Sequence, residues 1–195
     1  MKTLLIGAVA LASLFAASAA SAQTAGPQNP GPVIPGVCVF FNQQMLAQSS
    51  AGQSVQTRMT ALANEVQGEL QPYATTIQTE ATALQQGAAT IPADQMNQRR
   101  QALQARAQEA QQLQQTREEE LRYTLSEQRR LISVAVEPIL VAIYQEKGCG
   151  IMLDRESVFI MNPAMDVTGE VITRLNAQLP TLTFNRMPVP VQQGQ

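Results

Sequence analysis

Apolar side chains recur at helical spacing from Val55 to Leu84, and this pattern predicts that a long part of the chain forms a single helix. The successive gaps are 4, 3, 4, 4, 3, 4, 4 and 3 residues, so these side chains fall on one helical face. Their repeating sum of 11 residues predicts a nearly straight helix rather than a heptad coiled coil. We therefore expect a helix from about residue 50 to 86, packed along a stripe made of Val55, Met59, Leu62, Val66, Leu70, Tyr73, Ile77, Ala81 and Leu84.

The segment that follows is predicted to return alongside this helix. Gly87 is placed to end the first helix and Pro92 to begin the second, so the sequence GAATIPA indicates the tip of a hairpin. At about 1.5 Å per residue the first helix would be roughly 55 Å long. Two such helices enclose almost no interior, so much of the hairpin must be solvated. The second helix is expected to pack against the first through an apolar stripe of its own, made of Met96, Leu103, Ala107, Ala110, Leu121, Leu125, Ile132, Ile139 and Ile143.

Short β-favouring segments flank the hairpin. Residues 37–41 and the sequences CGIMLD and SVFIM predict three short strands, and Asp166 or Thr168 can cap a final helix. Pro138 marks a bend, and we expect a separate helix around it. The predicted fold class is mostly α with a small β hub. We expect the hub to comprise residues 37–50 and 137–179, and the antiparallel helical arm residues 51–136. Unpaired strand edges predict that the hub oligomerises.

The two ends of the chain differ in composition from the rest. Residues 1–22 combine Lys2, a short apolar core and a small-residue end, which is the layout of a cleaved secretory signal peptide. Residues 23–36 are rich in proline and glycine and predict a flexible lead-in. Residues 180–195 predict an extended tail, with disorder as an alternative beyond Phe184. Because a secretory signal peptide directs export, we expect the mature protein to work outside the cytoplasm.

Composition argues against several classes of function. Histidine is absent, which removes the usual general base and metal ligand, so we expect no enzyme, no metal and no cofactor. Removing Lys2 with the signal peptide leaves 12 of the 13 basic side chains against 15 acidic ones. A nucleic-acid partner is not expected, because binding to phosphates needs a basic surface.

Three acids in the hub invite comparison with a catalytic carboxylate pair. Asp154, Glu156 and Asp166 lie near one another in the sequence, and facing carboxylates can perform acid–base chemistry. Asp154 at a strand end and Asp166 before a helix also suit turn bonding and capping. The structural interpretation is favoured, and Asp166→Asn tests the catalytic one.

The two cysteines occupy strand-forming segments of the same hub. An exported chain with Cys38 and Cys149 so placed favours a disulfide. The alternative is two buried free thiols. A redox centre is disfavoured because the Cys-x-x-Cys motif is absent.

The arm offers two further candidate sites. Pro72 cannot donate a backbone hydrogen bond to Gly68, so we expect a hinge where glycine makes the helix pliable. Arg99 and Arg100 near the hairpin tip are candidates for contacts with an anion or with a bound protein.

The order of these features resembles the Skp/OmpH family of periplasmic chaperones. The resemblance rests on VCVFFNQQMLAQSSAGQSVQ before the hairpin and on YQEKGCGIMLDRESVFIMNPAMDVTGEVITRLN after it, and it covers about residues 37–176. It implies a homotrimer whose β hub carries three helical tentacles. These tentacles enclose unfolded outer-membrane β-barrel proteins without using ATP. The arm itself matches only in helical character.

Charge separates this chain from the family, whose members are often markedly basic, as suits contact with anionic membrane surfaces. The mature chain is mildly acidic, so Arg99 and Arg100 remain the candidates for a weak membrane-surface contact. A second hypothesis is a structural adaptor, an exported coiled-coil hairpin that bridges components of the cell envelope. Such an adaptor would bind a folded partner through its tip and ignore unfolded proteins.

Overall fold

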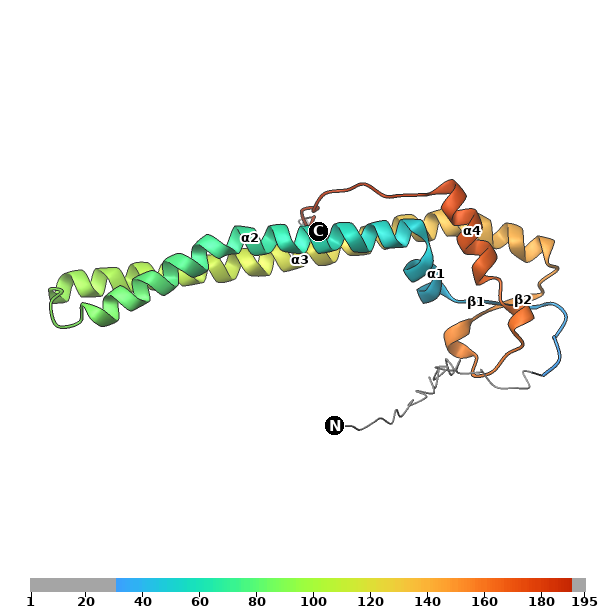
Figure 1. Ribbon diagram of the computed structural model, residues 1–195, viewed down its shortest axis with the longest axis horizontal. Coiled ribbons are helices and arrows are strands. Elements are labelled where there is room, and N and C mark those ends of the chain that lie inside the picture. Colours follow the sequence, from blue (N-terminus) through green and yellow to red (C-terminus); the bar gives the residue numbers. More distant parts are fainter. Residues whose placement is uncertain (1–30, 191–195) are drawn as a thin grey trace, which may run out of the picture. The chain divides into compact units, whose positions relative to one another are not determined.

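The computed structural model describes residues 31–190. The predicted signal peptide, lead-in residues 23–30 and tail residues 191–195 lie outside this range. Two long helices run alongside each other, and the short elements gather at one end of them (Figure 1). The elements are β1 (Val37–Phe40), α1 (Asn42–Gln48), α2 (Ser50–Gln86), α3 (Ala93–Glu146), β2 (Ile151–Asp154), η1 (Arg155–Ser157), η2 (Pro163–Met165) and α4 (Thr168–Gln178), where η marks a 3-10 turn.

The long helices pack along the predicted stripes. All nine stripe positions of α2 are at least half-buried, and of the nine on α3 only Ala107 is exposed. The turn between the helices lies where Gly87 and Pro92 were expected to place it, because the Gly87 amide caps α2 and α3 follows Pro92 directly. The mostly α fold predicted from the sequence is thus confirmed.

The expected separate helix around Pro138 is wrong, because α3 runs unbroken to Glu146. Pro138 lies on the exposed side of the helix, and so does Val134, whose carbonyl loses its hydrogen bond. Water can satisfy a carbonyl that faces solvent, so a long helix tolerates a proline there. Pro72 is likewise exposed, and α2 continues through it.

A short helix and a tight cap precede α2. The Ser49 side chain accepts a hydrogen bond from the Gly52 amide, which satisfies one of the free donors at the start of α2. Gly52 lies directly against the Leu46 backbone of α1, where no β-carbon would fit. This close approach lets α1 fold back onto the first turn of α2.

The sheet contains two parallel strands, with Val37 opposite Ile151 and Phe40 opposite Asp154. A bridge from Val39 to Asp166 continues the pairing on the other side of β1. The strands, α1, α4 and the adjacent ends of α2 and α3 share one apolar core. Its buried members are Cys38, Met45, Ala51, Val55, Ile132, Val136, Ile139, Ile143, Cys149, Val167, Val171 and Leu175.

The third predicted strand, in the sequence SVFIM, is wrong. Residues 158–161 have no regular secondary structure, and two turns lie on either side of them. In these turns the Asp154 side chain accepts from the Glu156 amide and the Asn162 side chain accepts from the Ala164 amide. These hydrogen bonds between side chains and the backbone compete with the hydrogen bonds that the backbone would make in a β-sheet. Phe159, between the two turns, is 93% exposed.

The tail segment (residues 180–190) has no regular secondary structure and runs back over the two long helices (Figure 1). Among residues 31–190, no helix combines the length and apolarity needed to cross a bilayer.

Candidate functional site

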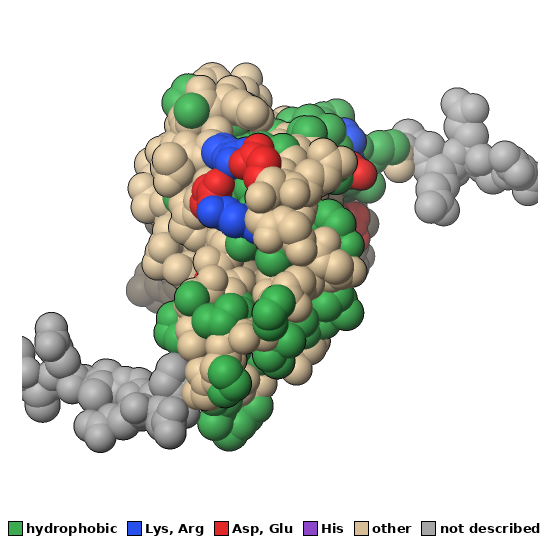
Figure 2. Space-filling model, turned by 90° about the vertical axis from the view of Figure 1, so that its right-hand side faces the viewer, with side chains coloured by type: hydrophobic (Ala, Val, Ile, Leu, Met, Phe, Trp, Pro, Cys, Tyr) green, Lys and Arg blue, Asp and Glu red, His purple; other side chains and the backbone are tan. Residues whose placement is uncertain are grey.

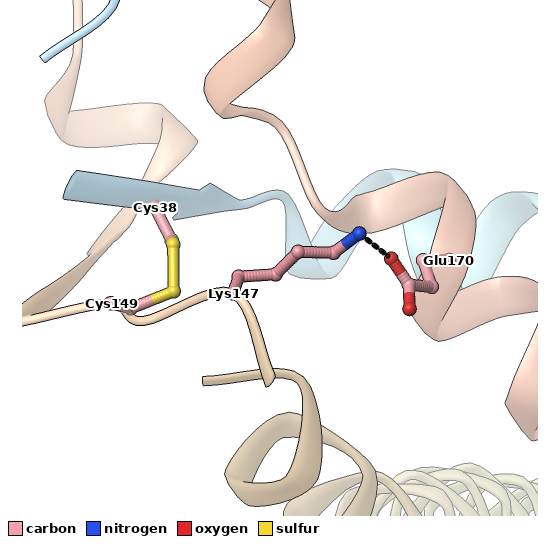
Figure 3. Close-up of a disulfide and its surroundings, with 4 residues drawn as sticks. All are labelled: Cys38, Lys147, Cys149 and Glu170. Atoms are coloured by element: carbon pink, nitrogen blue, oxygen red, sulfur yellow. Dashed lines mark ion pairs between the residues drawn. A yellow bond between two sulfur atoms is a disulfide. The ribbon is translucent and has the colours of Figure 1, made fainter. Parts of the chain in front are cut away.

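A disulfide and several ion pairs hold the short elements together. Cys38 of β1 is bonded to Cys149 just before β2, and both side chains are buried (Figure 3). Beside this bond, the Lys147 ammonium lies 2.8 Å from the Glu170 carboxylate of α4. Hydrogen bonds from Lys147 and then Arg174 lower the pKa of Glu170. Arg174 also pairs with Glu146, so α4 is anchored to the end of α3.

Two of the three candidate acids make turn or capping hydrogen bonds. Asp154 accepts from the Glu156 amide at 2.8 Å, and Asp166 accepts from the Thr168 amide at 2.8 Å. Glu156 is exposed. The Thr168 side chain in turn accepts from the Phe41 amide at 2.9 Å, which ties α4 to the end of β1. These contacts are the turn bonding and capping that the structural interpretation requires.

No cluster of His, Cys, Asp or Glu in residues 31–190 is arranged to hold a metal ion. The cavities found over the same range are open grooves rather than enclosed pockets. One of them measures about 990 Å³ and lies between α1 and the adjacent parts of α2 and α3. Its lining includes Leu46, Val55, Leu125 and Ile132 together with the amide side chains of Asn42, Gln53 and Gln56.

Large apolar side chains are exposed around the β-strand end of the molecule. Hydrophobic side chains gather over part of this end in Figure 2. Folded monomers rarely expose such groups together without a partner. We call this set the apolar face, and its members are Val33, Ile34, Ile151, Phe159 and Ile160, each at least 48% exposed.

Four charged side chains meet near the middle of the two long helices. Arg186 of the tail segment lies 2.8 Å from Glu69 of α2 and 2.9 Å from Glu120 of α3. Arg117 completes the set, at 2.6 Å from Glu69 and 3.0 Å from Glu120. Arg186 is only 18% exposed, so the tail inserts a largely buried cation between two helices. The hydrogen bond from Arg186 is the main cause that lowers the pKa of Glu69, and Arg117 adds to it.

The backbone of the tail segment is also bound. Ser54 accepts from the Leu182 amide at 3.0 Å, Arg58 donates to the Phe184 carbonyl at 3.0 Å, and Thr124 accepts from the Met187 amide at 2.8 Å. Thr124 and Gln128 are buried on α3 because the tail covers them. Sequence reasoning missed this site. Its one signal was a polar pair four residues apart beside the apolar stripe.

We expect acid to loosen the tail segment. The lowered pKa of Glu69 means that its ion pairs stabilise the fold above the ordinary carboxyl value of 4.5 and are lost as pH falls through the lower folded value. Hydrogen-exchange protection of the Met187 amide should therefore fall below pH 4.5, while that of buried Ile143 persists. Arg186→Gln should weaken protection at neutral pH and flatten the pH dependence. Equal pH dependence in both proteins would contradict the assignment.

The tip residues differ in their surroundings. Arg99 donates to Glu80 at 2.6 Å, and this hydrogen bond raises the pKa of Arg99. Its neighbour Arg100 is exposed. Farther from the tip, the guanidinium of Arg106 lies 4.4 Å from the ring centre of Tyr73, and the Tyr73 hydroxyl donates to Glu109. Arg99 is therefore engaged within the hairpin, and Arg100 is the more accessible of the two cations.

The hinge candidates lie next to the charged cluster. Gly68 and Pro72 are both exposed on α2, and no atom lies within 4 Å of the position that a β-carbon on Gly68 would occupy. Glu69 stands between them in sequence, so the tail binds α2 within one turn of the proline.

Comparison with known proteins places this architecture in a family. The sequence model described as "OmpH: Outer membrane protein (OmpH-like)" matches residues 36–175. A search of curated proteins gives no match. The crystal structure of a candidate outer membrane chaperone (OmpH-like) from Caulobacter crescentus CB15 superposes with a TM-score of 0.74 at 34% sequence identity. That likeness covers 84% of this chain and 96% of the other. The chain therefore belongs to the OmpH-like family.

Proposed function

We propose that this protein is an ATP-independent periplasmic holdase chaperone, which binds unfolded outer-membrane β-barrel proteins between helical arms and prevents their aggregation. Membership of the OmpH-like family and the likeness to a candidate outer membrane chaperone support this function. The secretory layout of residues 1–22 supports a periplasmic location.

One observation carries the proposal: beyond the hub and the tail segment, the long hairpin of α2 and α3 packs along a single stripe, and no other helix of residues 31–190 covers it. Its remaining surface is solvated and rich in glutamine, alanine and paired charges. Such a surface can make many weak contacts with a flexible chain, and holding a client requires no catalytic group. The client must then be captured by several arms at once.

We further propose that the hub, residues 37–50 and 137–179, assembles into a homotrimer from which three arms (residues 51–136) project. The apolar face supports self-association, because Phe159 and its neighbours would otherwise stay in water. The two-stranded sheet also leaves an edge that a second copy can cover. The grooves on a single arm are open to solvent, so enclosure of a client depends on this assembly.

Phe159→Asp should shift the protein from oligomer to monomer. A charge placed at the centre of a dry contact is left without a partner, so dissociation constants should rise by a factor of at least about 100. Sedimentation velocity at several concentrations measures the change. The matched control is Ala89→Asp at the exposed hairpin tip, which should sediment like the parent protein. An unchanged oligomer in Phe159→Asp would contradict the proposed interface.

Pro72→Ala tests the proposed hinge. Restoring the hydrogen bond to the Gly68 carbonyl should stiffen α2, so the distribution of distances between arm tips should narrow. Double electron–electron resonance between spin labels at Ala89 of each protomer measures that distribution. Pro138→Ala, at the other exposed proline of the long helices, is the control. A distribution that does not change in Pro72→Ala would reject the hinge.

Complex formation tests the function itself. An unfolded β-barrel protein diluted from urea should coelute with the chaperone in size-exclusion chromatography without any nucleotide. Neither the same barrel protein after refolding nor a folded water-soluble protein should coelute. If only a folded envelope component bound, and did so through residues 87–92 at the tip, the adaptor hypothesis would replace the holdase.

A further inference from the structure

We propose that the surface beneath the tail segment is a binding groove for an extended polypeptide with alternating apolar and polar side chains, and that the tail occupies it as a built-in competitor. The proposal rests on the proposed function, which it deepens by naming one surface that meets the client. We call this surface the tail groove. Its residues are Ser54, Arg58, Glu69, Glu120, Thr124 and Gln128.

The tail has the side-chain pattern of a β-strand although it pairs with none. From Thr181 to Asn185 the residues alternate exposed and half-buried, with Leu182 and Phe184 turned toward the molecule. Both pack against the apolar core at the end of the arm. Strands of outer-membrane barrels carry the same period of two, with apolar side chains facing the lipid. The tail thus has the same alternation of apolar and polar side chains as a segment of an unfolded barrel protein.

Three of the polar contacts that hold the tail involve main-chain groups, which every polypeptide shares. Ser54 and Thr124 accept from backbone amides, and Arg58 donates to a backbone carbonyl. Recognition of an extended chain through its main chain is tolerant of sequence, while alternate side chains supply preference. A chaperone with many different clients needs a surface of this kind.

One charged position adds selectivity. Glu69 and Glu120 together accept the Arg186 guanidinium, two residues beyond Phe184. Both carboxylates also contact Arg117, which stays on α3 when the tail leaves. The groove should therefore prefer segments that carry a cation two residues after an aromatic side chain.

Tethering explains how the groove is masked. A segment joined to α4 by a few residues competes at an effective concentration on the order of millimolar. The tethered tail therefore keeps short peptides that bind weakly out of the groove. A long unfolded client that engages several arms gains enough affinity to displace the tail.

The test uses the oxidised, full-length mature chain and a fluorescein-labelled peptide with the sequence of residues 180–190. Leu182→Asn combined with Phe184→Asn should release the tethered tail and leave the groove intact. Fluorescence anisotropy should then show peptide binding at least tenfold tighter than to the parent chain. A peptide of the same composition without the alternation should bind at least tenfold more weakly than the native order. Equal binding to both chains, or of both peptides, would overturn the proposal.

Groove variants in the released chain localise the binding. Ser54→Ala removes one acceptor and should weaken peptide binding roughly three- to tenfold. Ser126→Ala is the matched control, because each serine donates to the carbonyl three residues earlier at 2.7 Å and Ser126 faces solvent. A loss of equal size in both variants would count against the groove.

A second measurement needs no substitution in the tail. Saturating amounts of an unfolded barrel protein should raise hydrogen exchange at the Leu182 and Met187 amides of the parent chain. Unchanged protection of both amides in a chaperone–client complex would overturn the proposal while leaving the holdase function standing. If no client complex forms but the labelled peptide still binds the released chain, the groove stands and the proposed function fails.

Discussion

Replacing both cysteines with alanine is expected to lower the free energy of unfolding by about 4 to 5 kcal/mol. The Cys38–Cys149 bond closes a loop across 111 residues that contains the whole hairpin. The unfolded chain gains the entropy of that loop when the bond is absent, and the cost grows with the logarithm of its length. Both sulfurs also belong to the buried core, so the substitution removes packing in addition.

Urea unfolding at a fixed protomer concentration measures this change, because self-association shifts apparent stability with concentration. Reducing agent should destabilise the parent protein by a similar amount and leave the double variant unchanged. A parent protein that is indifferent to reduction after complete unfolding and refolding would show that the bond contributes little.

Gly52→Ala is the second large expected effect, a loss of at least about 2 kcal/mol. A β-carbon on Gly52 would overlap the carbonyl oxygen of Leu46, which is backbone and cannot rotate away. Either α1 must move or the first turn of α2 must open, and both changes disturb the cap from Ser49. Far-ultraviolet circular dichroism during thermal unfolding measures the loss.

Gly68→Ala on the same helix provides the matched control. Nothing lies within 4 Å of its added methyl group, so the better helix propensity of alanine should stabilise the protein by about 0.5 to 1 kcal/mol. The two substitutions are chemically identical and should have opposite signs. A similar small effect at both positions would contradict the close packing of α1 on α2.

The long-range order of this fold could be predicted because helical periodicity needs no knowledge of the partner. The spacing of apolar residues from Val55 to Leu84 determines which face of the helix is buried. Gly87 ends the first helix, and Pro92 precedes the second. The effect of Pro138 could not be predicted in this way. Whether a proline breaks a helix depends on where its carbonyl partner faces, which only the packed structure determines.

The failed strand at SVFIM has a different cause. Its residues favour β-structure, but a strand needs an edge to pair with, and two side-chain-bonded turns flank this segment and lead it away from the sheet in the single chain. The exposure of Phe159 follows from the same turns.

The tail groove was out of reach of sequence patterns for a further reason. Thr124 and Gln128 are buried by a segment more than 50 residues away: Thr124 accepts from the Met187 amide, and Gln128 donates to the Met187 sulfur. No local side-chain pattern encodes contacts of this range. Arg186 in a proline-rich tail gave no sign that it would lie between Glu69 and Glu120. The acids Asp154 and Asp166, by contrast, could be assigned to turns and caps from their positions alone.

The most direct test of the account is light scattering from an unfolded outer-membrane β-barrel protein diluted out of urea into the mature protein, without nucleotide and over a range of molar ratios. We predict suppression of aggregation that saturates near one oligomer per client and is reduced in Phe159→Asp, whose arms are no longer assembled. Undiminished scattering at a molar excess of the mature protein would contradict the holdase function.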